Sequence, residues 1–165
     1  MTDSFAVEVV TPETTLYAGP ATAVVLRTSI GSLTVMAGHA PFVGDVVPTE
    51  VKVEREGEPT MHLAVHGGFV QVDTSPDAAE GIEGADEGPI SGLTTRVTLL
   101  AGVAENAQDI DPARAEAARA DAQAAIDQLG TAQGEDAMVD VQRRQLQDAL
   151  ARAELRLQLA SRPSA

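Results

Sequence analysis

The sequence contains no cysteine, no tryptophan and a single lysine, Lys52. Without thiols, the chain can form neither a disulfide framework nor a thiolate metal site, and this composition is typical of a reducing compartment. No Gly-x-x-x-x-Gly-Lys-Ser/Thr pattern leads up to Lys52, so a P-loop nucleotidase is excluded. Aromatic residues make up only 2% of the chain. Large core side chains are therefore scarce, and we expect a partner to complete the burial of apolar surface.

Long apolar runs and basic charge are also missing. No run approaches the roughly 20 apolar residues that a membrane-spanning helix needs, and residues 1–4 show neither the basic nor the apolar part of an export signal. The net charge of −14 over 165 residues argues against nucleic acid or anionic lipid as a direct ligand, because phosphate groups are bound by basic surfaces. We expect a soluble, acidic, intracellular chain.

Short segments with strand character fill the first two thirds of the chain. They alternate apolar and polar residues or are rich in valine, and turn residues rather than helices separate them. This pattern predicts an antiparallel β-sandwich or barrel. The segments are residues 5–9, 21–28, 33–37, 50–56, 61–65, 69–72 and 96–100. Residues 31–44 hold three glycines, Pro41 and His39, which indicates a backbone path that must be held.

From Asp111 the apolar period changes from two residues to 3.6, which predicts helices. Asp111 can cap a helix that begins at Pro112 and stops at Gly130, and a second helix should end before Pro163. Two stripes are expected to face each other in an antiparallel hairpin: Ala115, Ala118, Ala122, Ala125 and Leu129, and Leu146, Leu150, Ala153, Leu157 and Ala160. Alanine buries little area, so the seam between these helices should be weak and able to open.

These patterns divide the chain into a β-sandwich domain, residues 1–106, and a helical hairpin domain, residues 107–165. Within the first, residues 74–95 are rich in Asp, Glu, Gly, Pro and Ser. Such a composition buries too little surface to offset its ordering entropy, which predicts a flexible acidic loop. An acidic docking loop is the functional alternative for this segment.

No catalytic or metal site emerges from the residues. On one strand His62 and His66 would lie about 13 Å apart, too far for a single ion. His39 has no visible relay partner, and its simplest interpretation is a hydrogen-bonded turn histidine. There is no Gly-x-Ser-x-Gly elbow and no arguable carboxylate pair, so we expect a non-catalytic protein.

Several motifs in the right order resemble the epsilon subunit of the F-type ATP synthase, of the bacterial type. That family's signature Gly-Xaa-Leu-Gly-Ile-Leu-Pro-Gly-His-Ala-Pro is matched by Gly31, Leu33, Gly38, His39, Ala40 and Pro41. Thr34 and Ala37 replace its second glycine and first proline. Residues 9–12, 64–72 and 96–101 are also similar to the family. The resemblance implies a β-sandwich followed by a two-helix hairpin.

The resemblance also implies a function in the central stalk, the rotor of the enzyme. The sandwich would dock on the gamma subunit and the c-subunit ring, and would help to couple proton translocation to ATP synthesis. The extended helices would restrain ATP hydrolysis by the alpha and beta catalytic subunits. The implied docking residues are Ser29, Gly31, Ser32, His39 and Pro41, and the implied inhibitory basic residues are Arg143, Arg144, Arg152 and Arg156. Such a peripheral subunit lies on the cytoplasmic face of the cell membrane, held there only by its partners.

Some bacterial members of that family bind ATP through an Ile/Leu-Asp-x-x-Arg-Ala element, which residues 110–115 match. No cofactor is required, but the match implies a regulatory ATP. The implied binding residues are Glu105, Asp111, Arg114, Ala115, Arg152 and Arg156. Alternatively, Asp111 only caps its helix, and the arginines form a solvated face that offsets acidic neighbours.

Two functions from other classes remain as alternatives. One is a small β-sandwich metal-dependent enzyme with a helical dimerisation tail, which metal analysis of the purified protein would reveal. The other is an adaptor with a helical interaction tail, which would leave the Gly-His-Ala-Pro stretch at residues 38–41 unexplained.

Overall fold

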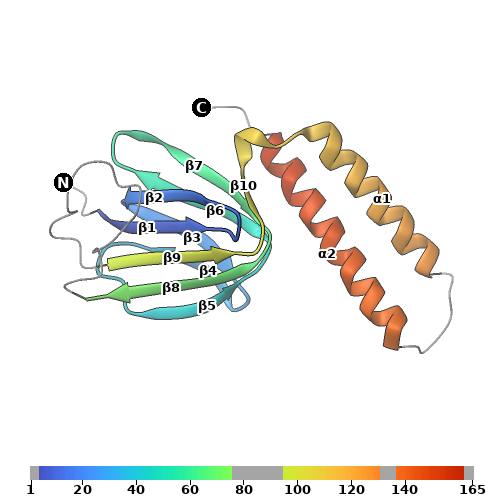
Figure 1. Ribbon diagram of the computed structural model, residues 1–165, viewed down its shortest axis with the longest axis horizontal. Helices are drawn as coiled ribbons and strands as arrows, with labels where there is room; N and C mark the ends of the chain where they lie inside the picture. The colour runs from blue at the N-terminus through green and yellow to red at the C-terminus, as the bar shows by residue number, and fades with distance from the viewer. Residues whose placement is uncertain (1–3, 76–94, 131–136, 162–165) are drawn as a thin grey trace. The chain divides into compact units, whose positions relative to one another are not determined.

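The computed structural model describes residues 4–75, 95–130 and 137–161. The chain separates into two compact units between Asn106 and Ala107. The first unit is built from strands and the second from helices (Figure 1). The predicted fold class, a β-sandwich followed by two helices, is confirmed.

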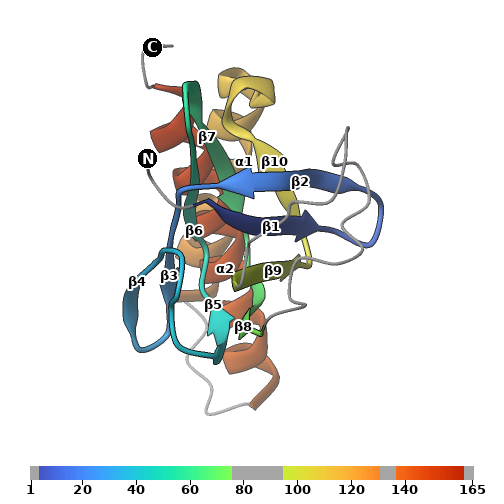
Figure 2. The ribbon, with the colours of Figure 1, turned by 90° about the vertical axis from the view of Figure 1, so that its left-hand side faces the viewer.

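The first unit is one strongly curved sheet whose inner faces pack on each other (Figures 1 and 2). Its strands are β1 (Phe5–Val10), β2 (Thr15–Ala21), β3 (Ala23–Thr28), β4 (Gly31–Val35), β5 (Phe42–Val46), β6 (Thr49–Arg55), β7 (Glu58–Val65), β8 (Gly68–Thr74), β9 (Thr95–Ala101) and β10 (Ala104–Asn106). The order across the sheet is β10-β7-β6-β3-β5-β8-β9-β1-β2, and β4 pairs with β3 off this path. Neighbouring strands are antiparallel except β1 and β9, which are parallel.

The core is filled by valine and leucine from alternate strand positions. Phe5, Leu26, Leu63 and Leu99 are the largest fully buried side chains, and many of the others are valines. Burying each such side chain contributes about 1.5–3 kcal/mol. Branched valines suit the pleated surface of a sheet, so the sandwich closes with few aromatic residues.

Three strands were not predicted from the sequence. β2 contains Gly19 and Pro20, which are typical of turns, but proline is tolerated in a strand at the border of a sheet. β5 contains Gly44 and Asp45, and β10 is too short to show a period. The predicted acidic loop began at Thr74 and ended at Thr95, but these two residues are paired strand residues. Residues 76–94 of that loop lie outside the described residues.

Gly68 allows β8 to approach β9 closely. Its φ is +152°, and a Cβ atom there would lie 2.1 Å from the carbonyl oxygen of Leu100. We expect Gly68→Ala to lower the free energy of unfolding by about 2–4 kcal/mol, because the backbone of β9 would have to shift. Gly102→Ala is the matched control, since a Cβ atom there meets nothing within 4 Å. Thermal denaturation checks this, and equal melting temperatures for the two variants would contradict it.

The second unit contains a short 3₁₀ turn, η1 (Ala107–Asp109), and the helices α1 (Pro112–Gly130) and α2 (Ala137–Ala160). Asp111 caps α1, as predicted: its Oδ1 accepts the backbone N–H of Ala113 at 2.9 Å and of Arg114 at 3.2 Å. The caps and the apolar period therefore define α1 correctly from the sequence.

The burial of the helix stripes was predicted only in part. Ala115 and Ala122 are buried in α1, but Ala118 is exposed, so its assignment to the seam was wrong. A short side chain reaches the neighbouring helix only where it points directly at it. In α2, Leu155 and Leu159 are buried although they lie off the predicted stripe.

Candidate docking surfaces

The turn between β3 and β4 is held by side chains at its base. The Oγ1 of Thr28 donates to the carbonyl oxygen of Gly31 at 3.0 Å, and the Oγ of Ser29 donates to Oδ1 of Asp45 at 2.6 Å. At the tip, 85% of Ile30 is exposed. Three expected docking residues, Ser29, Gly31 and Ser32, thus lie on a braced hairpin with an apolar tip, and the sequence did not single out Ile30.

The second group of expected docking residues, His39 and Pro41, lies in a turn that is bonded to β8 and β9. The backbone N–H of Gly38 donates to Oγ1 of the buried Thr95 at 2.8 Å. The Oγ1 of Thr74 donates to the carbonyl oxygen of His39 at 2.5 Å. The ring of His39 donates from Nδ1 to the carbonyl oxygen of Ala40 at 2.7 Å. These bonds fix the turn. The imidazole of His39 is hydrogen-bonded within it, as expected for a turn histidine.

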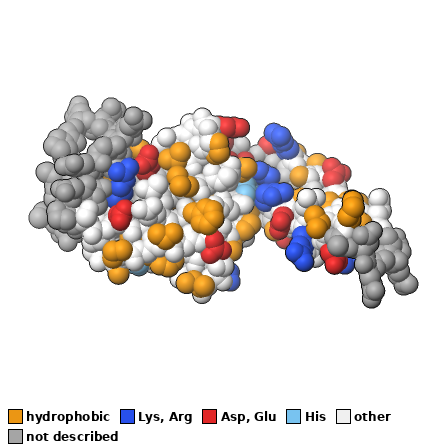
Figure 3. All heavy atoms as spheres, turned by 60° about the horizontal axis from the view of Figure 1, so that its bottom comes forward, with side chains coloured by type: hydrophobic (Ala, Val, Ile, Leu, Met, Phe, Trp, Pro, Cys, Tyr) orange, Lys and Arg blue, Asp and Glu red, His pale blue; other side chains and the backbone are white. Residues whose placement is uncertain are grey.

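An apolar patch covers the outer face of β5, β8 and β9. Val43, Phe69 and Leu100 are 72%, 62% and 54% exposed, and we call these three residues the apolar patch. Phe69 is paired with Leu100 on β9 and with Asp45 on β5. Val43 is two residues from Asp45 along β5 and therefore lies on the same face of the sheet. Figure 3 shows apolar side chains gathered over this part of the sandwich. A clustered exposed apolar surface of this kind marks a site of interaction.

Sequence reasoning missed the apolar patch, although a signal was present. A strand with one solvated face should alternate apolar and polar residues, yet β8 contains Phe69-Val70 and β9 contains Leu99-Leu100, with apolar residues on both faces. Val70 and Leu99 fill the core, so their neighbours have to point outward. Near the other end of β9, four residues from Leu100, Arg96 donates to Oε2 of Glu8 on β1 at 2.7 Å.

His62 in β7 and His66, the residue directly after β7, form separate pairs with carboxylates. His62 Nδ1 lies 2.6 Å from Oε1 of Glu50, and His66 Nε2 lies 3.1 Å from Oε1 of Glu105. Glu105, which was expected to bind ATP, thus contacts a histidine of its own unit. Across the described ranges, no three His, Cys, Asp or Glu side chains group in a way that could hold a metal ion.

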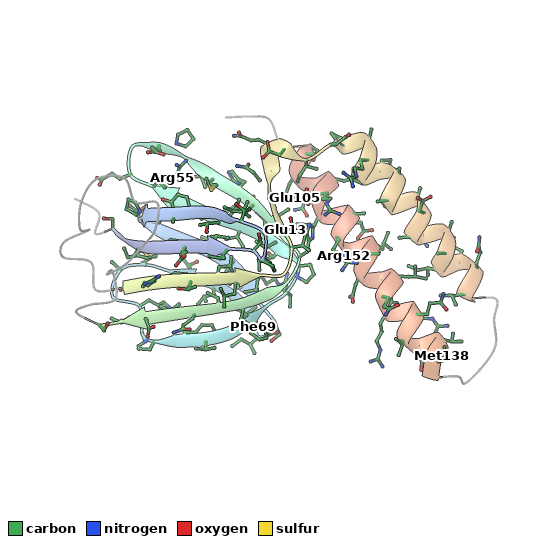
Figure 4. All side chains as sticks on the ribbon, in the orientation of Figure 1. Glu13, Arg55, Phe69, Glu105, Met138 and Arg152 are labelled. Carbon is green, nitrogen blue, oxygen red and sulfur yellow. The ribbon has the colours of Figure 1, made fainter. Side chains whose placement is uncertain are left out.

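The basic residues of the helical unit differ in their surroundings. Arg143 lies 3.6 Å from Asp140, while Arg119 contacts Glu116 at 2.6 Å and holds the pKa of that carboxyl below its usual value through a hydrogen bond. Arg152 and Arg156 are four residues apart and share one face of α2; Figure 4 labels Arg152. Arg114 is exposed in the first turn of α1, and its neighbour Ala115 is buried. Arg144 is exposed on α2.

Comparisons with known proteins agree with this architecture. The model of the ATP synthase delta/epsilon chain β-sandwich domain matches residues 4–76. A mitochondrial ATP synthase chain from Euglena gracilis superposes with a TM-score of 0.65 at 23% identity, over 92% of this chain and 78% of that chain. This likeness shows a shared fold. None of the helices in the described part of the chain has the length and apolar character needed to cross a membrane.

Curated relatives extend the match beyond the sandwich. The ATP synthase epsilon chain of Brevibacillus brevis is 35% identical over 113 residues, which is 68% of this chain and 70% of the relative. That of Bacillus subtilis is 36% identical over 117 residues, 71% of this chain and 73% of the relative. That of a Cyanothece species is 30% identical over 154 residues, 93% of both chains. The chain therefore belongs to the ATP synthase epsilon chain family.

Proposed function

We propose that this non-catalytic subunit of ATP synthase works in the central stalk, where it docks on the gamma subunit and the c-subunit ring. In this position it couples proton translocation to ATP synthesis. The observation that carries the proposal is the apolar patch, because a partner that covers Val43, Phe69 and Leu100 would bury an aromatic anchor at its centre. A partner that covers the patch would also complete the burial of apolar surface that the scarcity of aromatic residues led us to expect.

Each of the two docking surfaces serves one of the two partners. We assign the apolar patch and the neighbouring turn with His39 and Pro41 to gamma, and the β3–β4 tip with Ser29, Gly31 and Ser32 to the c ring. The hydrogen bond from Ser29 to Asp45 joins the tip to β5, and β5 also carries Val43 of the patch. Both contacts are thereby built on one braced strand, which suits a part that transmits torque between two partners.

The helical unit supplies the regulation. Its seam is built largely from alanine, including the buried Ala115 and Ala122, and therefore separates at little cost. After separation, Arg143, Arg144, Arg152 and Arg156 meet acidic surfaces of the catalytic alpha and beta subunits and restrain ATP hydrolysis. Arg144 is solvent-exposed and Arg143 is paired with the exposed Asp140, so both can exchange their contacts at low cost.

Regulatory ATP binds to the same unit through Arg114, Arg152 and Arg156, whose guanidinium groups suit a triphosphate. Asp111 keeps its role as the helix cap and fixes the backbone of the first turn of α1, which carries Arg114. Bound ATP favours the closed hairpin through its differential affinity for that state.

We expect millimolar ATP to give a binding isotherm in calorimetry with the full chain. Arg152→Gln should weaken this binding on the order of tenfold, the equivalent of about 1.4 kcal/mol. Arg119→Gln is the matched control, because Arg119 is already paired with Glu116 on α1. The absence of heat with the unaltered chain would refute ATP binding, and equal losses in the two variants would refute the assignment to Arg152.

The docking proposal is tested by recovering the tagged full chain from membranes of its source bacterium. Gamma, c, alpha and beta subunits should be recovered with it. The tag should be accessible from the cytoplasmic face, and this chain itself should not be inserted into the bilayer. Recovery of the chain without gamma would overturn the proposal. A stoichiometric metal ion in the purified protein would instead favour the metal-dependent enzyme.

A further inference from the structure

Strand β4 (Gly31–Val35) is an open border of the sheet. Among the described residues it pairs only with β3, through the register from Val24↔Val35 to Thr28↔Gly31. Figure 2 shows β4 at the outside of the sandwich with β3 along one of its sides. In an antiparallel pair, alternate residues of a border strand direct their N–H and C=O groups away from the partner. β4 therefore offers a row of backbone donors and acceptors.

Other border strands of this sheet carry features that prevent further pairing. β2 contains Pro20, and β7 contains Pro59 in the part that extends beyond β10. β5 carries the charged Asp45, and the short β10 carries Glu105. Proline and charged side chains at a border are the usual protection against the addition of a strand.

β4 has none of these protections. From Ile30 to Met36 the sequence contains no charged residue and no proline. Ser32 and Thr34 are exposed along the strand. The apolar side chains of Ile30 and Met36, 85% and 53% exposed, flank its two ends. A border strand without such protection is a template for pairing with another chain.

We propose that β4 is completed by an uncharged extended strand of a neighbouring ATP synthase subunit, which hydrogen-bonds along β4 and packs on Ile30 and Met36. This inference rests on the proposed function, because the expected docking residues lie within β4 or no more than six residues from its ends in the sequence: Ser29, Gly31, Ser32, His39 and Pro41. Strand addition gives affinity through backbone hydrogen bonds and specificity through flanking side chains.

Two other occupants fit β4 less well. The chain's own segment 76–94 is rich in Asp, Glu, Gly and Pro, which are depleted in strands. A second copy of this chain also carries a net charge of −14, so two copies would repel each other on approach.

Hydrogen exchange on the free chain and on the assembled complex tests the proposal. Amides of residues 32–36 that exchange in the free chain should be protected at least tenfold more in the complex. If Val43 and Phe69 became protected while these amides did not, strand addition would be overturned and the proposed function would stand. If no part of the sandwich became protected, the proposed function itself would fail. Protection already present in the free chain at all concentrations would identify segment 76–94 as the occupant, and protection that rises with concentration would identify a second copy.

A charge on β4 gives an independent readout. Thr34→Lys, and Ser32→Lys as a second variant at an exposed position, should weaken assembly into the complex on the order of tenfold. Thr34→Val keeps an uncharged strand and should assemble normally. Thr60→Lys adds the same charge on β7 and is the control for net charge. Normal assembly of both lysine variants of β4 would overturn the proposal. Circular dichroism of each variant confirms folding, and if Thr34→Lys does not fold, the protection of the amides of residues 32–36 decides.

Discussion

Phe69→Asp is expected to weaken binding of this subunit to the remainder of the ATP synthase on the order of 100-fold. Phe69 is the aromatic centre of the apolar patch, and the loss of such an anchor typically costs about 2–4 kcal/mol of binding free energy. The substitution also places a carboxylate beside Asp45, which is paired with position 69 across β5 and β8. A buried, unpaired charge at an interface adds to the loss.

Folding should be unaffected by Phe69→Asp, because 62% of the side chain is already in solvent. Titration of labelled subunit onto complex depleted of this chain measures the affinity. Phe69→Leu keeps an apolar side chain and should bind within a few-fold of the unaltered protein. Thr60→Asp, on β7 away from the patch, controls for the added charge. Unchanged affinity of the aspartate variant would remove the patch from the interface.

Removal of residues 111–165 is expected to raise ATP hydrolysis by the assembled enzyme on the order of tenfold, the equivalent of about 1.4 kcal/mol in the barrier. Assembly should persist, because both docking surfaces and the core of buried valine and leucine belong to the first compact unit. The comparison is the rate of phosphate release by membranes with the truncated and the full subunit, at equal amounts of complex.

A finer variant separates charge from bulk in this regulation. Replacing Arg143, Arg144, Arg152 and Arg156 together by glutamine should keep both helices but removes four basic side chains from α2. If the contact with the catalytic subunits is electrostatic, this variant should reproduce most of the gain, and high salt should mimic it in the unaltered enzyme. Hydrolysis that is unchanged after truncation, with assembly intact, would exclude an inhibitory role.

The fold was largely readable from the sequence because its local signals agree with one another. Alternating residues such as Val7 and Val9 define strands, and the cap at Asp111 with the stop at Gly130 defines α1. β2 and β5 were missed because Pro20 and Gly44 satisfy turn rules locally, while their pairing depends on distant strands. Burial of Leu155 and exposure of Ala118 depend on what lies against each helix face, which the period of 3.6 alone does not specify.

The candidate sites were predictable only where one short motif contains them. The turn with His39 and Pro41 was recognised from its glycines and proline, but not its bonds to Thr74 and Thr95, which come from far along the chain. The apolar patch draws single residues from β5, β8 and β9, and each is unremarkable in its own segment. Only the register of the sheet brings Val43, Phe69 and Leu100 onto one face.

The pairing of Thr74 with Thr95 has a practical consequence for observing rotation. The chain leaves β8 and re-enters β9 at two positions that are already neighbours, and both hydroxyls hold the adjoining turn. Closing a longer connection between such fixed ends costs only about 0.6 kcal/mol for each doubling of its length. In the proposed central-stalk position, an epitope or a fluorescent reporter inserted between these threonines would travel with the rotor as a marker of its angular position, and leave the apolar patch and the β3–β4 tip unaltered.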